Sequence, residues 1–259
     1  MIDGVKKMAR DMSVKVLRQE LVANNLANVN TPGFKTQRAF TTVLKQSMGT
    51  DAAGMNQRPE TGRQAGGATP KAAAVVGEKV TSIYTSFEQG RIEYTHRSLD
   101  VAIDGEGFFV VDTPYGERFT RSGSFTITEA GLLATYGGNL VRGEGGPIAI
   151  QGGEIKITPD ARVVVDGEEV DTLKVVNFQA PENLTRSGNT FASKTEPYGE
   201  VDFAQTQIVQ GALERSNVNP IDEMVEMIAL HRGFEADQQS IRLQIDASKK
   251  LLERVGDIQ

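Results

Sequence analysis

The chain has 259 residues, enough for one large domain or two ordinary ones, and either can bury a substantial core. Its net charge of -6 and its scattered Lys and Arg residues argue against nucleic acid as the main partner, because phosphate binding needs clustered positive charge. The absence of Cys excludes disulfides, thiolate metal sites and cysteine nucleophiles. No apolar run reaches the about 20 residues of a membrane span, so we expect neither such a span nor a cleaved signal peptide.

Residues 2 to about 28 carry a pattern that predicts an amphipathic helix. One seam, apolar except at Gln19, contains Ile2, Val5, Ala9, Met12, Val16, Gln19, Ala23 and Leu26. Lys and Arg residues lie off the seam. A basic helix of this kind could rest on a membrane surface, but pairing with another helix of the chain is the simpler use.

Residues 23–35 end this helix and contain four Asn residues followed by Thr31, Pro32 and Gly33. Asn tolerates left-handed backbone, and a Pro-Gly turn stops a helix. The segment therefore predicts a fixed exit from the helix. The residues expected to hold that exit are Asn25, Asn28, Pro32, Gly33 and Phe34.

Residues 46–77 are rich in Gly, Ala, Gln and Thr and show no apolar period, so residues 36–80 are expected to form a linker that is flexible or ordered on assembly. Residues 81–209 then predict a β-rich domain of about ten short strands. Two hairpins are expected within it. Residues 104–107 should join the strand at 99–103 to the strand at 108–111, and Asp166-Gly167 should form a second turn.

A catalytic role has weak support. His96 and His231 stand alone, without the spacing of a metal site. Asp104 and Glu106 could act as an acid and base pair in glycoside hydrolysis, but the glycines beside them mark a tight turn in which acidic residues are common. We therefore expect no enzyme, no cofactor, no metal and no small-molecule substrate, and keep a β-rich carbohydrate-active enzyme or binding module as the distant alternative.

Residues 210–259 predict a long carboxy-terminal helix. Asn219 suits the cap, Pro220 suits the first helical position, and Asp222 and Glu223 complement the positive end of the helix dipole. Asn217, Asn219 and Pro220 should fix the start of this helix. Its pattern continues to about Val255, and it also carries apolar residues off its main seam, more than one partner helix would cover.

The expected fold is α+β, with long N- and C-terminal helices in a coiled-coil-like bundle and an inserted all-β domain. The expected divisions are residues 1–35, 36–80, 81–209 and 210–259. The residues expected to pair the helices are Met12, Val16, Leu26, Met227, Phe234, Ile241 and Ile245.

Four blocks of the chain carry a family resemblance, namely residues 23–35, 89–111, 119–125 and 210–241. They resemble the signatures of the flagellar basal-body rod and hook protein family, in order and over nearly the whole chain. Residues 145–150 and the β run to Phe178 resemble the proximal rod proteins more than the distal rod proteins, which remain the alternative.

This resemblance implies a structural subunit that assembles through its terminal helices into the helical, torque-transmitting rod. It implies contacts with copies of itself, other rod subunits and the flagellar export apparatus. It also implies a periplasmic rod position in the basal body, reached by flagellum-specific export without a cleaved signal. A head-to-tail interface that does not close into a ring would give the filament that a rod requires.

Overall fold

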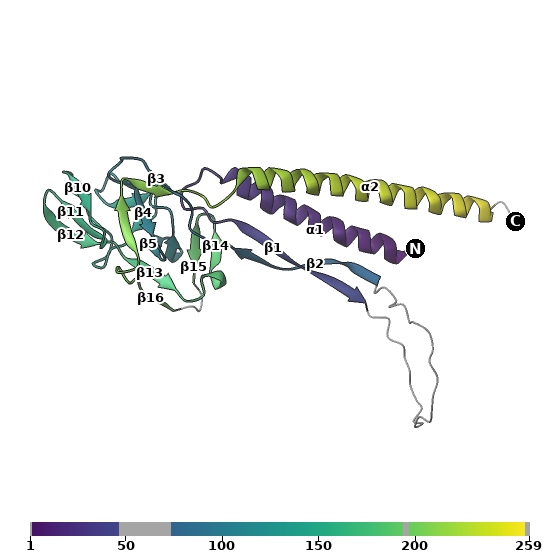
Figure 1. Ribbon diagram of the computed structural model, residues 1–259, viewed down its shortest axis with the longest axis horizontal. Coiled ribbons are helices and arrows are strands. Elements are labelled where there is room, and N and C mark those ends of the chain that lie inside the picture. The colour runs from purple at the N-terminus through teal and green to yellow at the C-terminus, as the bar shows by residue number, and fades with distance from the viewer. Residues whose placement is uncertain (1, 47–73, 194–196, 257–259) are drawn as a thin grey trace, which may run out of the picture. The chain divides into compact units, whose positions relative to one another are not determined.

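The computed structural model of the protein describes residues 2–46, 74–193 and 197–256 (Figure 1). These residues form two α-helices, eighteen strands and one short 3-10 helix. The chain divides into two compact units. Unit 1 contains residues 1–19, 39–83 and 229–259, and unit 2 contains residues 20–38 and 84–228.

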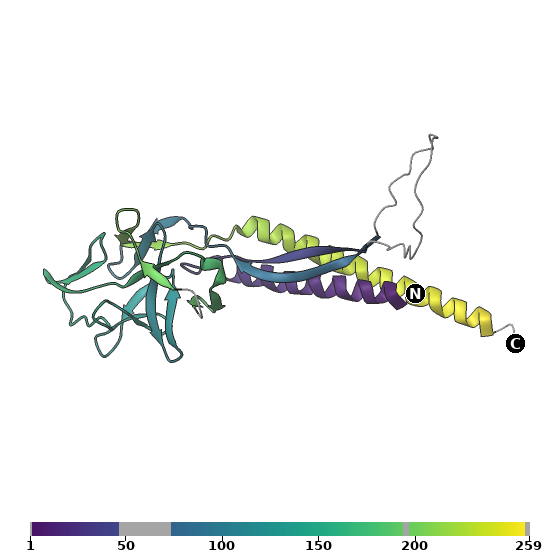
Figure 2. The same cartoon turned by 90° about the horizontal axis from the view of Figure 1, so that it is seen from below.

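Unit 1 is built from most of the two terminal helices and a two-stranded sheet. The helices are α1 (Ile2–Ala27) and α2 (Pro220–Gly256), and the strands are β1 (Gln37–Gln46) and β2 (Ala74–Thr85). Figure 2 shows α1 in purple beside α2 in yellow, with the β1 and β2 ribbon alongside. Lys15 links the helices, because its Nζ donates to Asp237 Oδ2 at 2.6 Å and to the Gly233 carbonyl at 3.1 Å.

The expected coiled-coil-like bundle is wrong. The described residues contain only two helices beside a large β-rich body, an α+β arrangement with terminal helices. Val16 and Ile245 are 40% and 46% exposed, and the other expected pairing residues, Met12, Leu26, Met227, Phe234 and Ile241, are half-buried. The buried apolar residues of the helices, Val14, Val22 and Leu230, lie off the expected seams. Polar residues interrupt both seams: Gln19 in the first helix, and His231 and Gln238, which fall on the same helical spacing as Met227, Phe234 and Ile241 in the second. The seams therefore do not support continuous knobs-into-holes packing.

The region expected as a linker carries strand at both ends. β1 and β2 cover residues 37–46 and 74–85, and they pair with each other. Phe40 and Ile83 are about half exposed, at 56% and 45%. Residues 47–73, the centre of the expected linker, lie outside the described residues.

The described residues of unit 2 form four sheets. The largest has the order β14 (Thr185–Ser187), β15 (Thr190–Ala192), β6 (Gly116–Thr120), β5 (Phe108–Thr113), β9 (Leu140–Val141), β8 (Leu133–Thr135) and β7 (Phe125–Ile127). To it belong β13 (Val175–Phe178), which pairs with β5, and β16 (Tyr198–Glu200), which pairs with β13. The second sheet has β10 (Ile155–Ile157), β11 (Arg162–Val165) and β12 (Glu168–Thr172) in that order. Two strand pairs complete the unit: β4 (Val101–Asp104) with β17 (Gln207–Gln210), and β3 (Ile92–Tyr94) with β18 (Ala212–Glu214).

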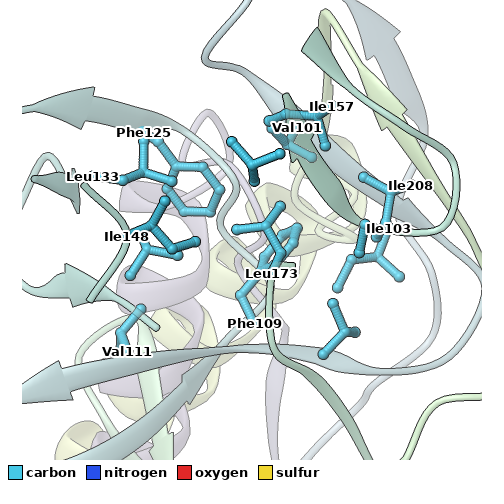
Figure 3. Packing of buried hydrophobic residues seen from close by; sticks show 14 of the residues in the cluster. Val101, Ile103, Phe109, Val111, Phe125, Leu133, Ile148, Ile157, Leu173 and Ile208 are labelled. Atoms are coloured by element: carbon cyan, nitrogen blue, oxygen red, sulfur yellow. The ribbon is translucent and has the colours of Figure 1, made fainter. Parts of the chain in front are cut away.

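The core of unit 2 consists of two apolar clusters. Figure 3 shows the larger one, in which Phe109 of β5 and Phe125 of β7 converge with Leu173, which lies between β12 and β13. The smaller cluster is aromatic: Phe108, Phe119, Phe178 and Phe191 meet edge to face, with ring centroids 4.8–5.8 Å apart. Edge-to-face packing adds about 0.5–1.5 kcal/mol per pair to the stabilisation from burial.

One expected hairpin is present and the other is not. Asp166-Gly167 joins β11 to β12 as a two-residue turn with positive φ at both positions, which confirms that prediction. The strands on either side of residues 104–107 do not pair, so the first hairpin prediction is wrong. β4 pairs with β17, while β5 pairs with β6, β9 and β13. Val101, Ala102 and Ile103 are fully buried, and the long-range partner β17 supplies the backbone hydrogen bonds that this buried strand needs.

Candidate functional site

Four segments of unit 2 meet where α1 ends and α2 begins. They are the last turns of α1, the exit turn at residues 28–36, the segment 86–90 and the segment 214–223. We call this meeting point the joint. It is held mainly by polar side chains bonded to backbone groups from distant parts of the sequence.

Asn25 connects the end of α1 to the segments beyond it. The side chain is 1% exposed. Its Nδ2 donates to the Gln37 carbonyl at 2.9 Å, and its Oδ1 accepts from the Gln37 amide at 3.0 Å. Nδ2 also donates to Glu223 Oε2, in the first turn of α2, at 3.2 Å. One amide side chain therefore ties α1, the start of β1 and the start of α2 together.

Asn217, in the segment before α2, connects that segment to the exit turn and to residues 86–88. Its Oδ1 accepts from the Thr36 amide at 2.8 Å and from the Thr36 hydroxyl at 2.7 Å. Its Nδ2 donates to the carbonyls of Ser86 at 3.0 Å and Glu88 at 3.1 Å. All four hydrogen bonds that an Asn side chain can make are used.

Replacing Asn217 with Asp is expected to lower the free energy of unfolding by about 2–3 kcal/mol. The carboxylate has the same shape but loses both donors and faces the Ser86 and Glu88 carbonyls, which then lack a partner. Urea unfolding of the purified full chain, followed by circular dichroism, measures the change. Asn30→Asp at an exposed position is the matched control, and equal effects of the two substitutions would contradict this account.

Gly33 allows the exit turn to pack against unit 2. It has a φ of +67°, and a Cβ there would lie 2.4 Å from the Arg121 carbonyl carbon and the Ser122 nitrogen. The next residue, Phe34, is 2% exposed and lies under Arg186, whose guanidinium carbon is 4.0 Å from the ring centroid. Arg186 also donates to the Lys35 carbonyl at 2.6 Å, and burial lowers its pKa to about 10.

A buried ionic cluster lies beneath this turn. Lys35 Nζ is 2.6 Å from Glu214 Oε1, and both side chains are fully buried. Lys35 also donates to the Glu88 carbonyl at 2.7 Å, and Glu214 Oε1 accepts from the Gly90 amide at 2.9 Å. Arg121 Nη1 lies 3.6 Å from Glu214 Oε2, and neither atom has a hydrogen-bond partner. Two cations therefore share one carboxylate.

Burial determines the electrostatics of the joint. Burial lowers the pKa of Lys35, and the adjacent Glu214 carboxylate offsets part of that shift. Burial also lowers the pKa of Arg121, again opposed by Glu214. Burial raises the pKa of Glu223, which the hydrogen bond from Asn25 partly opposes. The charged forms of these groups are thus stabilised by their partners rather than by water.

Of the remaining residues expected at the exit and the helix start, Asn28 and Asn219 make local contacts, while Pro32 contacts a distant turn. Asn28 donates to the Asn24 carbonyl at 2.8 Å, and the Pro32 carbonyl accepts from Asn189 at 3.1 Å. Asn219 Oδ1 accepts from the Ile221 amide at 3.1 Å, and α2 begins at Pro220. The structure thus places all eight expected residues in the segments of the joint, with Asn25, Gly33, Phe34 and Asn217 at contacts between distant parts of the chain.

Sequence reasoning missed Lys35, Gly90, Arg121 and Glu214. A signal was nevertheless present, because each of the four blocks of family resemblance contains one of these residues. A Cβ on Gly90 would lie 1.9 Å from the Arg215 carbonyl oxygen, so this glycine also permits a close backbone approach. All four blocks contribute to one buried cluster, although residues 23–35 and 210–241 lie near opposite ends of the chain.

The residues weighed for catalysis are not brought together in a site. Asp104 accepts from Gln89 at 3.1 Å, and Glu106 accepts from Asn177 at 2.9 Å. His231 lies 3.6 Å from Glu235 on the exposed side of α2. Over residues 2–46, 74–193 and 197–256, no group of His, Asp and Glu is arranged to hold a metal ion, and no helix is long and apolar enough to cross a membrane.

Comparison with known sequences identifies the family. Three family models match the chain. "Flagella basal body rod protein" covers residues 15–35, "Flagellar hook protein FlgE/F/G D1 domain" covers 102–170, and "Flagellar basal body rod FlgEFG protein C-terminal" covers 209–252. The flagellar basal-body rod protein FlgF of Caulobacter vibrioides is 30% identical, over 93% of this chain and 94% of the relative. The chain belongs to the flagellar basal-body rod family.

Other relatives in this family carry two different names. FlgF of Rhizobium meliloti is 31% identical over 92% of both chains, and FlgG of Bacillus subtilis is 31% identical over 86% of this chain and 87% of the relative. Members of the rod family are structural proteins, and this chain is a structural rod protein rather than an enzyme. The amino-terminal family model covers the end of α1 and the exit turn to residue 35, and the carboxy-terminal model covers the segment 214–223, so both match segments of the joint.

Proposed function

We propose that this rod protein assembles with copies of itself and with other rod subunits through its terminal helices, and that the resulting helical structure transmits torque. The observation that supports this most directly is an apolar stripe on the first turns of α2. Ile221, Met224, Val225 and Ile228 follow helical spacing and are 67%, 46%, 62% and 54% exposed. A contiguous exposed apolar surface of this kind usually marks an interaction site.

The stripe is expected to be covered in the assembled rod. Its residues are exposed in the single chain, while Glu223 and Leu230 on the same helix are buried. Fully burying an exposed Val, Ile or Met side chain contributes about 1.5–3 kcal/mol. The four residues are 46–67% exposed, so covering them contributes roughly half of that for each and offsets part of the cost of ordering a subunit on assembly. Phe234 and Ile241, both half-buried further along α2, are proposed to add to the same contacts.

Replacing Val225 with Asp is expected to reduce incorporation into basal bodies at least tenfold, because it places a charge in the proposed interface. Immunoblots of isolated basal bodies measure incorporation, and the circular dichroism of the purified variant should remain unchanged. Gln239→Asp, an exposed polar position on the same helix, is the matched control. Normal incorporation of the Val225 variant would remove the stripe from the interface.

The proposed position of this subunit is the proximal rod, with the distal rod as the alternative. The resemblance of residues 145–178 supports the proximal position, and FlgF and FlgG relatives of similar identity keep the alternative open. The length of rod that remains in cells lacking the chain distinguishes the two positions. We also propose that the subunit reaches the periplasmic rod through the flagellar export apparatus, without a cleaved signal peptide and without binding a small molecule.

A further inference from the structure

Four turns of unit 2 surround a groove of about 610 Å³. They are the β5–β6 turn at residues 113–116, the β8–β9 turn at 135–139, the β14–β15 turn at 187–190, and the exit turn at Thr31 and Pro32. Tyr115 and Tyr136, on two of these turns, are 86% and 65% exposed. Exposed aromatic side chains are enriched at protein interfaces, because a rigid ring covers a large area at a small entropic cost.

The groove favours a negatively charged occupant. Arg118 is the one charged side chain among the residues that line it, and its guanidinium makes no hydrogen bond or ion pair within the described parts of the chain. Arg97 lies nearby and holds Tyr136, because its Nη2 donates to the Tyr136 hydroxyl at 2.7 Å, while its Nη1 lies 3.8 Å from Asp100 Oδ1. No carboxylate lines the groove. An acidic loop would therefore find an unpaired guanidinium and exposed aromatic rings.

The chain itself presents such a loop at the turn between β11 and β12. Asp166, Glu168 and Glu169 fall within four residues, and all three are exposed. Glu169 forms one ion pair, in which its Oε2 lies 3.5 Å from Arg162 Nη1. Glu168 forms no ion pair or side-chain hydrogen bond within the described residues. Val170, next along β12, is 44% exposed and adds apolar surface beside the charges. We call residues 166–170 the acidic tip.

The acidic tip cannot reach the groove of its own chain. Within unit 2, β11 and β12 lie at one end, while β14 and β15 lie at the other, near the start of α2 (Figure 1). The groove and the tip are different surfaces, so a contact between two copies is head-to-tail rather than self-complementary. A head-to-tail contact forms a ring if the rotation between neighbouring subunits closes after a whole number of copies. If the rotation does not close, the contact repeats as a helical filament.

We propose that the acidic tip of one subunit docks into the groove of the next copy of this chain, with Glu168 facing Arg118. This inference rests on the proposed assembly function and adds a second contact, separate from the apolar stripe on α2. The charges fix the register of neighbouring subunits, and the two tyrosines exclude water around them.

Chemical cross-linking tests the contact directly, because the natural chain contains no Cys. In the doubly substituted chain Pro114→Cys, Val170→Cys, which keeps Arg118, both glutamates and both tyrosines, a short bis-maleimide added to isolated basal bodies is expected to give dimers and longer ladders of this protein. Each single substitution should give none. If the double variant enters basal bodies at the normal level but does not cross-link to itself, the groove contact is wrong while the assembly function stands.

A charge swap provides the second measurement. Arg118→Glu is expected to reduce incorporation at least fivefold, and adding Glu168→Arg and Glu169→Arg in the same chain should restore most of it. Arg91→Glu, an exposed Arg outside the groove, is the matched control and should incorporate normally. Failure of the swap to restore incorporation, with the variant still folded by circular dichroism, would overturn the pairing of tip and groove.

Discussion

Replacing Glu214 with Gln is expected to lower the free energy of unfolding by about 3–5 kcal/mol, the cost of leaving buried cations without their anion. Lys35 and Arg121 both depend on this carboxylate, and Lys35 and Glu214 are fully buried. Gln keeps the size of the side chain, removes the charge and replaces one acceptor oxygen with an NH2 donor. Urea unfolding followed by circular dichroism suits this protein, since it has no Trp to report by fluorescence.

The matched control for this prediction is Glu93→Gln, which breaks the exposed ion pair with Arg215. Solvent screens that pair, so little change is expected. A similarly small effect at Glu214 would show that the buried cluster does not depend on its negative charge.

The same variant should respond to pH in a defined direction. Without Glu214, the pKa of Lys35 in the folded state falls further below its ordinary value of 10.5. Between the lowered folded pKa and that ordinary value, the unfolded chain binds more protons than the folded chain, so stability rises with pH. The Glu214→Gln variant is therefore expected to recover part of its lost stability as the pH rises through this window.

Replacing Gly33 with Ala is expected to lower the free energy of unfolding by about 2–5 kcal/mol. Two effects add. The left-handed backbone costs a residue with a side chain about 1–2 kcal/mol, and the new methyl group overlaps backbone atoms of Arg121 and Ser122, which costs about 1–3 kcal/mol more. Backbone atoms cannot move aside as a side chain can, so the exit turn must shift away from unit 2.

Gly188→Ala separates the two effects. Gly188 has a φ of +63°, close to that of Gly33, but a Cβ there would meet nothing within 4 Å. The control therefore carries the conformational cost alone, and thermal or urea unfolding of both variants gives the steric part as the difference. Equal destabilisation would mean that the exit turn is not packed as tightly as the structure shows.

Signals that lie within a few residues allowed several features to be predicted from the sequence. The start of α2 follows from Asn219 and Pro220, with Asp222 and Glu223 in the first turn. The β11–β12 turn follows from Asp166-Gly167. Both depend on backbone preferences of the residues themselves. The exit from α1 was located in the same way, although its contacts were not.

The coiled-coil-like bundle and the hairpin at residues 104–107 could not be decided locally. A heptad seam indicates one face of a helix but not what covers that face, and Val14, Val22 and Leu230 are buried instead of the expected seam residues. Two buried strands joined by a glycine-rich turn can pair with each other or with distant strands. The choice depends on β17, which follows β4 by about a hundred residues in the sequence.

The sequence by itself determined the terminal helices, the exit turn of α1 and the turn at Asp166-Gly167, because these depend on the backbone preferences of neighbouring residues. Its four blocks also carried the resemblance to the family. The tertiary structure alone decided that Lys35, Arg121 and Glu214 meet, and that Asn25 and Asn217 bind backbone groups far along the chain. The physical reason is that burial removes water from a charged side chain, so a protein partner must take the place of that water. Long-range packing alone brings such a partner into position. Such pairing leaves no period in the sequence.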